Sequence, residues 1–378
     1  MSWLLTIPLA CLVAGSWVYC VLTVIAARRY RAVRPPPLAR AEPISVLKPL
    51  HGLDEGLEEN LRSFFEQDYP CFDLLFAARE SSDPALALVE HLRSAYPGVP
   101  VRTFVTGEPP YPNAKVWSLQ TMMREARYDL LVMSDSDIRV TPELLKTIAA
   151  EFQDGRIGVA TCPYRAVAGA SLWSRLEAAG MNTEFWGGCL TARLVEGGVH
   201  FAVGPTIAAR KSVIEEVGGW ETLSQYLVED FVLGQFAAER GRGVILSSYV
   251  VEHRIGTQQI RPNFAHRLRW NRSTRRSRPA GYVGQIFTNP LPLAVLLAAA
   301  QPHWWPAVVA AAGLRAAAAL EVCAGVLKEK PGFRAAGFVL LQDFLSFGFW
   351  MAGFFGNTIV WRGRRYLLQP DGRFVFIR

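Results

Sequence analysis

The segment Asp129-Leu-Leu-Val-Met-Ser-Asp135-Ser-Asp137 decides the expected fold. Its apolar run Leu130–Ser134 predicts a buried strand, and two carboxylates one residue apart follow it. Side chains at positions i and i+2 leave a strand in the same direction, so Asp135 and Asp137 can face one ligand. Mg²⁺ and Mn²⁺ prefer oxygen ligands and often retain substrate phosphates, so this pair predicts a divalent-cation site that binds a diphosphate. The alternative is a solvated turn before a helix that begins near Thr141.

The residues on both sides of this segment alternate strand-like and helical patterns from residue 35 to about 282. The expected strands are Ile44–Leu47, Leu74–Ala78, Val101–Val105, Leu130–Ser134, Val159–Cys162 and Val244–Val250. The expected helices are Leu57–Gln67, Pro84–Tyr96, Ala114–Ala126, Pro142–Phe152 and Asp230–Glu239. This alternation predicts a parallel α/β sheet, in which a ligand binds beyond the carboxyl ends of the strands. The acidic motifs fall at those ends, and neither Gly-rich phosphate-loop motif is present.

Two polar sites precede the D-x-D segment. Asp83, in Ser81-Ser-Asp-Pro84, could accept hydrogen bonds from a base or ribose, and the alternative is a helix N-cap followed by proline. Lys115 lies near the start of an expected helix, where it could meet a phosphate together with the helix amides.

Two more sites follow it. Asp230 begins an expected helix and could be the general base that deprotonates an acceptor hydroxyl, with helix capping as the alternative. The segment His266-Arg-Leu-Arg269-Trp270 opens a basic run. Arg269 can bind a phosphate bidentately and Trp270 can pack on an acceptor, whereas the alternative is a juxtamembrane helix that binds anionic head groups.

Two other segments have less specific interpretations. The glycine-containing loop Val203-Gly-Pro-Thr206 is either an acceptor-side loop or part of the core. His253 follows an expected strand, and we expect it to be an ordinary surface or core histidine.

Apolar segments flank this region. Trp3–Ala27 carries no charge and is long enough to cross a hydrocarbon core of about 30 Å, with a signal peptide as the alternative. Arginines follow at once, which predicts that the downstream chain is cytoplasmic, and Pro35–Pro37 is a stiff spacer. Phe287–Ala300 and Trp304–Leu327 are expected to form a hairpin.

A third apolar block, Ala335–Trp361, makes the topology ambiguous. Three crossings would place the basic tail outside, so either one block is re-entrant or interfacial or the tail is outside; we expect a cytoplasmic tail. Gln342 and Asp343 indicate that this block is partly buried against protein.

The composition excludes several classes. The 378 residues are 51% hydrophobic with a net charge of +7, which is too apolar for a disordered chain. Arginines gather beside the apolar segments, as in Arg362-Gly-Arg364-Arg365, which indicates membrane-flanking charge and no nucleic-acid partner. The six cysteines form no C-x-x-C pair, so a disulfide framework or zinc site is not expected and the compartment is reducing.

These motifs together resemble the processive-type nucleotide-sugar glycosyltransferases, with their signature D, D-x-D, D, (Q/R)-x-x-R-W. The chain is most similar to ceramide glucosyltransferases and the related bacterial hopanoid glycosyltransferases. The matching sequence segments are Ile44-Ser-Val-Leu-Lys-Pro-Leu50, Phe64-Phe-Glu-Gln-Asp-Tyr-Pro70, Tyr128-Asp-Leu130, Asp135-Ser-Asp-Ile-Arg-Val140, Gly218-Gly219, Glu229-Asp230, Arg269-Trp270 and Trp361-Arg-Gly-Arg-Arg-Tyr366. The resemblance implies an α/β GT-A domain with a Rossmann-like sheet, one N-terminal and two to three C-terminal membrane helices.

The resemblance also implies roles for single residues. Asp83 would contact uridine, Asp135 and Asp137 would bind the Mg²⁺ or Mn²⁺ and the diphosphate, and Lys115 would lie near the nucleotide. Asp230 would be the base of an inverting transfer. Arg269 and Trp270 would close the donor and acceptor site together with His266, which stands where the family has Gln or Arg.

The implied activity is sugar transfer from a UDP-sugar to a membrane lipid hydroxyl, with glucose and ceramide expected first. Transfer of N-acetylglucosamine to a hopanoid polyol such as bacteriohopanetetrol is the close alternative. A processive polysaccharide synthase would need more membrane helices, and a non-enzyme alternative is a membrane-anchored module that binds anionic lipid.

The expected domains are a 1–34 anchor, a 35–282 catalytic domain on the cytoplasmic face of a bacterial inner membrane, 283–361 membrane helices and a 362–378 basic tail.

Overall fold

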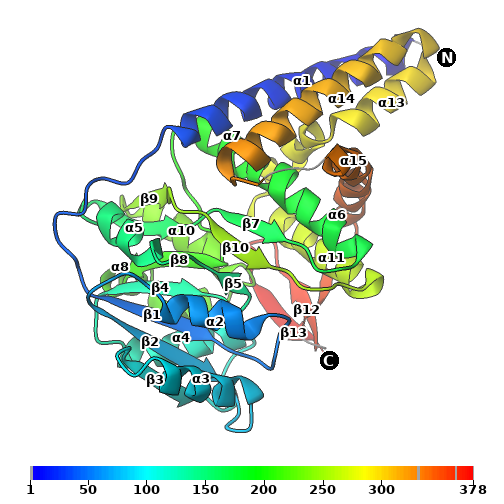
Figure 1. Cartoon of the computed structure of the whole chain (residues 1–378). Coiled ribbons are helices and arrows are strands. Elements are labelled where there is room, and N and C mark those ends of the chain that lie inside the picture. The colour runs from blue at the N-terminus through cyan, green and yellow to red at the C-terminus, as the bar shows by residue number, and fades with distance from the viewer. Residues whose placement is uncertain (1–2, 330–332, 362–363, 378) are drawn as a thin grey trace. The chain divides into compact units, whose positions relative to one another are not determined.

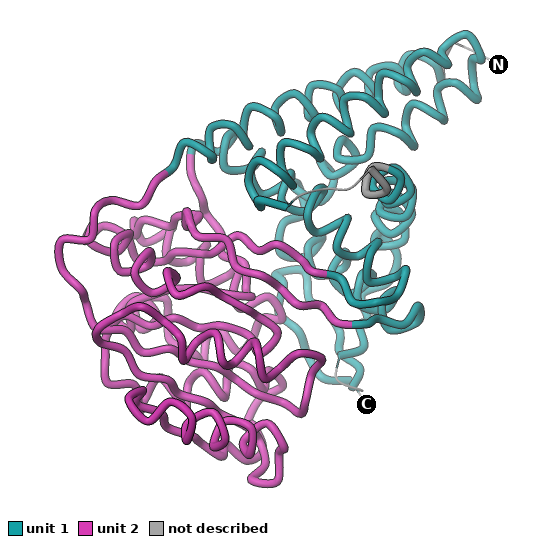
Figure 2. The backbone as a smooth tube through the Cα atoms, viewed as in Figure 1, with its two compact units in different colours: residues 1–33, 168–197, 257–378 teal, residues 34–167, 198–256 magenta. Residues whose placement is uncertain are grey.

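The computed structural model describes residues 3–329, 333–361 and 364–377, and the chain forms two compact units (Figure 2). Residues 34–167 and 198–256 form one unit, which we call the sheet unit. Residues 1–33, 168–197 and 257–378 form the other, which we call the helical unit. The domain boundaries expected from the sequence stay a prediction.

The sheet unit is built on a seven-stranded sheet with strand order β3-β2-β1-β4-β8-β6-β9 (Figure 1). The strands are β1 (Ile44–Pro49), β2 (Phe72–Ala78), β3 (Val101–Val105), β4 (Leu130–Ser134), β6 (Ile157–Thr161), β8 (Thr206–Arg210) and β9 (Gly243–Leu246). Strands β1, β2, β3 and β4 pair in parallel, as do β6 and β9. The α/β class expected from the sequence is confirmed.

The expectation of a wholly parallel sheet is wrong, because β8 runs antiparallel to both β4 and β6. Strand β8 is not among the strands expected from the sequence, and its residues Thr-Ile-Ala-Ala-Arg include two alanines of low strand propensity. Burial between two strands stabilises it in spite of this composition. The antiparallel direction places Thr206, at the start of β8, beside Ser134, at the end of β4. The loop before β8 therefore arrives at the edge where the D-x-D segment begins.

Helices cover this sheet, and a small second sheet accompanies it. The helices are α2 (Leu57–Phe65), α3 (Pro84–Ala95), α4 (Ala114–Glu125), α5 (Leu144–Glu151), α8 (Lys211–Glu216), α9 (Gly219–Leu223) and α10 (Glu229–Glu239). The five expected helices agree with these bounds to within two residues. The second sheet consists of β5 (Ile138–Arg139), β10 (Val251–Arg254) and β7 (Tyr164–Val167), in that order. Because His253 pairs with Ile138, β10 lies next to the turn that carries Asp135 and Asp137.

The helical unit contains the apolar helices. Its elements are α1 (Trp3–Arg31), α6 (Leu172–Gly180), a π-helical turn η1 (Met181–Phe185), α7 (Trp186–Val195), α11 (Ile260–Ser277), α12 (Pro279–Gly284), η2 (Gln285–Thr288), α13 (Pro290–Ala300), η3 (Pro302–Trp304), α14 (Trp305–Leu320), η4 (Glu321–Val326) and α15 (Phe333–Gly353). Among the described residues, Leu5–Arg31 and Pro302–Val326 are long and apolar enough to cross a membrane. Pro279–Thr288 and Pro290–Ala300, bent by 63°, would make a third span if they cross together.

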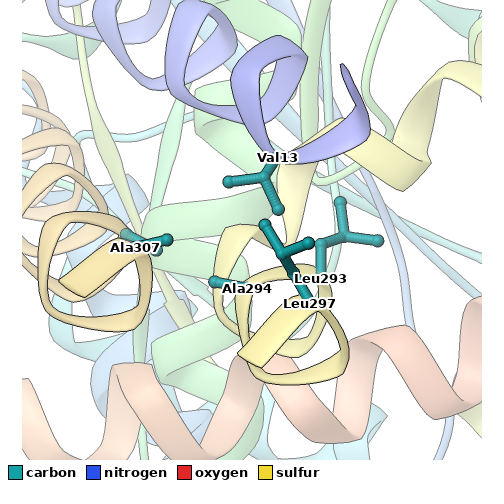
Figure 3. Close-up of a cluster of buried hydrophobic side chains, with 6 residues drawn as sticks. Val13, Leu293, Ala294, Leu297 and Ala307 are labelled. Carbon is teal, nitrogen blue, oxygen red and sulfur yellow. The ribbon is translucent and has the colours of Figure 1, made fainter. Parts of the chain in front are cut away.

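Helices α1, α13 and α14 pack side by side (Figure 1). Their contact is a small apolar cluster of Val13, Leu293, Ala294, Leu297, Ala307 and Ala311 (Figure 3). Alanines at the contact let the helix axes approach closely, as is usual between helices in membranes. The expected hairpin of two apolar segments is therefore present as α13 and α14.

The apolar block Ala335–Trp361 contains two kinds of structure. Helix α15 ends at Gly353, and Thr358–Trp361 is strand β11 of an antiparallel sheet with β12 (Arg364–Leu368) and β13 (Phe374–Ile377). The expected burial of Gln342 and Asp343 against protein is confirmed, since Asp343 Oδ1 accepts a 2.7 Å hydrogen bond from Arg315 Nε of α14. Arg362, one of the predicted membrane-flanking arginines, lies outside the described residues.

Candidate active site

Asp135 and Asp137 lie in the turn between β4 and β5, at the carboxyl end of β4. The backbone N–H of Asp135 donates to the carbonyl of Pro205 at 3.0 Å, from the loop before β8. The carbonyl of Asp137 accepts from the N–H of Arg254 at 2.8 Å, at the end of β10. Two segments distant in sequence therefore fix the backbone of the D-x-D turn.

Asp135 is paired with Lys115, whose Nζ lies 2.7 Å from Asp135 Oδ1. Lys115 also donates to the carbonyl of Gly204 at 3.4 Å and lies 3.7 Å from Glu229 Oε1. Burial alone would lower the pKa of Lys115, but the carboxylates of Asp135, Glu229 and Asp230 raise it above its ordinary value. Lys115 is therefore a permanent cation beside the D-x-D turn.

Asp137 is paired with His253 of β10, whose Nε2 lies 3.0 Å from Asp137 Oδ2. Burial raises the pKa of Asp137, but His253 and the nearby lysines outweigh it, so the pKa is lowered overall. The second oxygen, Asp137 Oδ1, is buried and has no hydrogen-bond partner among the described residues. His253 is thus a part of the site, in contrast to the ordinary histidine expected from the sequence.

A second lysine, Lys48, is fully buried at the end of β1, the neighbour of β4. Its Nζ donates to the Asp135 carbonyl at 2.8 Å and to Ser134 Oγ at 3.4 Å, and lies 3.6 Å from the centroid of the Phe64 ring. Burial lowers the pKa of Lys48 to about 7, although Asp135 and Asp137 oppose the shift. Lys48 is not among the site residues expected from the sequence. The signal was present, because a lysine inside an apolar strand needs a buried partner.

Asp230 lies in the first turn of α10, which has no side-chain cap. A Cβ atom at Gly204 would come within 2.6 Å of Asp230 Oδ2, so the carboxylate packs directly on this glycine. The neighbouring Glu229 accepts a 3.0 Å hydrogen bond from Asn113 Nδ2, and burial raises its pKa to about 7. The loop before β8, which the sequence left open between an acceptor loop and core packing, therefore lies in this carboxylate cluster.

Asp83 is the N-cap of α3, as its alternative interpretation predicts, and accepts from the N–H of Ala85 at 3.0 Å. It also accepts from the N–H of Gly52 at 3.0 Å, in the loop after β1. From the same loop, Asp54 accepts from Ser136 Oγ at 3.3 Å. One loop thus connects Asp83 to the D-x-D turn.

The structure therefore brings Lys115, Asp135, Asp137 and Asp230 together at one edge of the sheet unit, with Asp83 linked through a loop. His266, Arg269 and Trp270 lie on α11 in the helical unit. Within that unit the His266 and Trp270 rings contact each other at a tilt of 59°, with centroids 4.7 Å apart, and His266 Nδ1 lies 3.8 Å from Glu177 Oε1. The roles assigned to these three residues stay predictions.

The donor set fits a hard divalent cation. Asp137 Oδ1 is a buried carboxylate oxygen without a hydrogen-bond partner in the described part of the chain, and Asp135 offers a second carboxylate from the same turn. Among the described residues there is no cluster of three or more His, Cys, Asp or Glu side chains that could bind a metal without other ligands. Two protein carboxylates completed by water and phosphate oxygens are the usual arrangement for Mg²⁺.

Comparison with known proteins identifies a family and several relatives of this chain. The family model described as glycosyl transferase family 21 matches residues 8–374. Ceramide glucosyltransferase 1 of Caenorhabditis elegans is 29% identical over 231 residues, which cover 59% of this chain and 47% of that protein. The ceramide glucosyltransferase of Komagataella phaffii is 31% identical over 105 residues, covering 27% of this chain and 21% of that protein. The chain thus spans about half or less of the length of these curated relatives.

The fold is also found among solved structures. One of these is a mannosyltransferase from Pyrobaculum calidifontis in complex with GDP-Man and Mn²⁺, with a TM-score of 0.53 and 17% identity. The alignment covers 92% of this chain and 97% of the other. At this identity the likeness concerns the fold, and it supports the GT-A-like architecture expected from the sequence.

Proposed function

The chain belongs to glycosyl transferase family 21, and from this membership we propose that it transfers a sugar from a UDP-sugar to a hydroxyl group of a membrane lipid. The observation that carries the proposal is the gathering of Asp135, Asp137 and Asp230 around Lys115 at one sheet edge. Glucose and ceramide are the favoured pair, because the similar curated proteins are named ceramide glucosyltransferases.

The D-x-D turn would handle the donor. Asp135 and Asp137 would bind the divalent cation, which when bound neutralises charge on the diphosphate leaving group. Lys115 adds a fixed positive charge at the start of α4, where the helix amides also favour a phosphate. Asp83 would bind the nucleoside from the loop side of the same edge.

Asp230 would act as the base. Its carboxylate takes the proton from the acceptor hydroxyl while the acceptor oxygen forms a bond to the anomeric carbon. The bond from that carbon to the UDP oxygen breaks at the same time, so the configuration inverts. Packing against Gly204 fixes the carboxylate, and Lys115 contacts the carbonyl of the same glycine. Arg269 and Trp270 are proposed to complete the donor and acceptor site.

Replacement of Asp230 by Asn tests the assignment. The matched control is Glu239→Gln, at the exposed other end of α10, where the carboxylate accepts a 2.8 Å hydrogen bond from Gln235 Nε2. We expect D230N to fold, to bind UDP, and to lose at least 100-fold in kcat, in line with general-base catalysis worth about 10²–10⁴. A normal rate of transfer by D230N would remove the base assignment.

The acceptor and sugar are tested by the purified protein in detergent with UDP-glucose or UDP-N-acetylglucosamine against ceramide or bacteriohopanetetrol. Glucosylceramide as the product supports the favoured pair. Transfer of N-acetylglucosamine to the hopanoid polyol would support the alternative. Lipid association without any transfer would support a binding module in place of an enzyme.

A further inference from the structure

The C-terminal sheet β11-β12-β13 has one face that is buried except at Phe376, which is 49% exposed, and one face that is exposed. On the buried face Ile359 pairs with Tyr366, and the ring centroids of Tyr366 and Phe374 are 5.1 Å apart. All three side chains are almost fully buried. These contacts give the sheet a small apolar core of its own within the helical unit.

The exposed face is also apolar. Val360 is 56% exposed, Leu367 41% and Val375 45%. The strand register places these residues on one face, because Leu367 pairs with Val375 and Val360 pairs with the exposed Arg365. A contiguous apolar face with a basic residue in it is unusual for a surface in water and is typical of a binding surface.

The apolar surface continues into the helix that precedes the sheet. Met351, in the last turn of α15, is 45% exposed, and Phe355, just after the helix, is 74% exposed. Only Gly356 and Asn357 separate Phe355 from the start of β11. The apolar helix and the apolar sheet face therefore follow each other directly along the chain.

Arginines of α11 attach this region to the helix that carries His266, Arg269 and Trp270. Arg272 donates to the carbonyls of Phe355 at 3.1 Å and Thr358 at 2.5 Å. Arg275 donates to the carbonyl of Gly356 at 2.8 Å, and both Arg275 and Arg276 donate to Asn357 Oδ1 at 2.6 Å. These arginines belong to the basic run that opens at His266, and in the structure they bind the segment between the end of α15 and the start of β11.

We propose that the exposed face of the C-terminal sheet is a membrane-contact surface that lies on an anionic bilayer and seats α11 at the lipid boundary. Its apolar side chains would enter the head-group region and Arg365 would contact lipid phosphates. The bilayer is the occupant that the structure favours. The same compact unit contains the helices long enough to cross a membrane, and the face is continuous with an apolar helix and carries positive charge.

The test is photo-crosslinking of the full-length protein in vesicles of phosphatidylcholine with phosphatidylglycerol. p-Benzoylphenylalanine is incorporated in place of Val360 or of Val375. The matched control position is Val105, a valine of 55% exposure on the edge strand β3 of the sheet unit, compared with 56% for Val360. Lipid adducts and protein adducts are counted by mass spectrometry.

We expect at least a fivefold higher yield of lipid adducts at Val360 and Val375 than at Val105. Arg365→Gln should lower the yield of phosphatidylglycerol adducts about fivefold, because one basic residue near an anionic surface strengthens binding by about that factor. The yield of phosphatidylcholine adducts should stay unchanged. Lipid yields equal to those of Val105, or adducts mainly between two copies of the chain, would overturn the proposal. An unchanged phosphatidylglycerol yield in R365Q would overturn the part assigned to Arg365.

Discussion

Substitution of Lys48 by Met tests whether a buried lysine organises the D-x-D turn. Methionine keeps most of the length of the side chain but removes the ammonium group. Two contacts are lost, a 2.8 Å hydrogen bond to the Asp135 carbonyl and a 3.4 Å contact with Ser134 Oγ. A hydrogen bond to a charged group contributes about 1.5–3 kcal/mol. If this energy positions the turn for the transition state, kcat/KM falls about tenfold to a hundredfold.

Protein stability should respond differently. Burial of an ammonium group costs desolvation energy that an apolar methionine does not incur, which offsets the lost hydrogen bonds. Phe64, 3.6 Å from the amine, can pack against the thioether in place of the cation. We therefore expect the melting temperature of K48M to stay within a few degrees of the wild type while activity falls.

The assay combines steady-state kinetics with a thermal melt in the same detergent, together with UDP binding in the presence of Mn²⁺. Lys211→Met is the matched control. Lys211 Nζ also donates to a backbone carbonyl, that of Ala126 at 2.5 Å, but at the opposite end of β8 from the D-x-D turn. Wild-type kcat/KM in K48M would refute the positioning role. A melting temperature that falls in parallel with activity would show that Lys48 supports folding alone.

Three further predictions concern the same cluster. Burial raises the pKa of Glu229 to about 7, so between pH 4.5 and about 7 the folded protein binds a proton at Glu229 that the unfolded chain releases, and stability falls as pH rises through this window. Glu229→Gln should therefore raise the melting temperature relative to wild type more at pH 8 than at pH 5. An equal difference at both pH values would contradict this prediction. Gly204→Ala places a Cβ 2.6 Å from Asp230 Oδ2 and should lower kcat at least tenfold, whereas Gly155→Ala, where nothing lies within 4 Å, should leave kcat unchanged in the same kinetic assay. Chelation by EDTA should abolish transfer, and Asp137→Asn should weaken UDP binding in the presence of Mn²⁺ in calorimetry but not in its absence; equal UDP affinities with and without Mn²⁺ would argue against a cation at the turn.

Local patterns predicted the part of the site that depends on one strand. The apolar run before Asp135 predicted strand β4 and the residue at which it ends. Parallel pairing of the strands then places the carboxyl ends of neighbouring strands at the same edge of the sheet. The N-cap at Asp83 and the helix start before Lys115 are likewise local, because a cap needs only residues within one turn. These features could therefore be deduced without tertiary information.

His253, Gly204 and Lys48 could not be assigned in this way. The contact of His253 with Asp137 spans 116 positions and depends on the pairing of β10 with β5. Gly204 reaches Asp230 because β8 runs antiparallel, a direction that its alanine-rich sequence does not indicate. Register and strand direction are set by the whole sheet.

The C-terminal block illustrates the limit of apolar content as a signal. Hydrophobic composition alone gave one segment, Ala335–Trp361, but it does not separate helix from strand. Gly356, with a φ of 75°, adopts the left-handed conformation after the helix ends, and the β-branched residues of Thr358–Val360 then favour a strand. The glycine and the β-branched residues were visible in the sequence, but the arginines of α11 that bind this junction come from about 80 positions earlier.

The charges of the site suggest how cation and donor would bind. Each carboxylate of the D-x-D turn already has a side-chain partner, the Lys115 ammonium group for Asp135 and the His253 ring for Asp137, and Lys48 donates to the backbone carbonyl of Asp135. A divalent cation entering this site alone meets carboxylates whose negative charge is largely compensated, and it meets nearby cations that repel it. A UDP-sugar brings a diphosphate whose negative charge offsets the added cation and the lysines together. We therefore expect Mn²⁺ to bind weakly to the protein alone and much more tightly with UDP, so that metal and donor occupy the site as one unit.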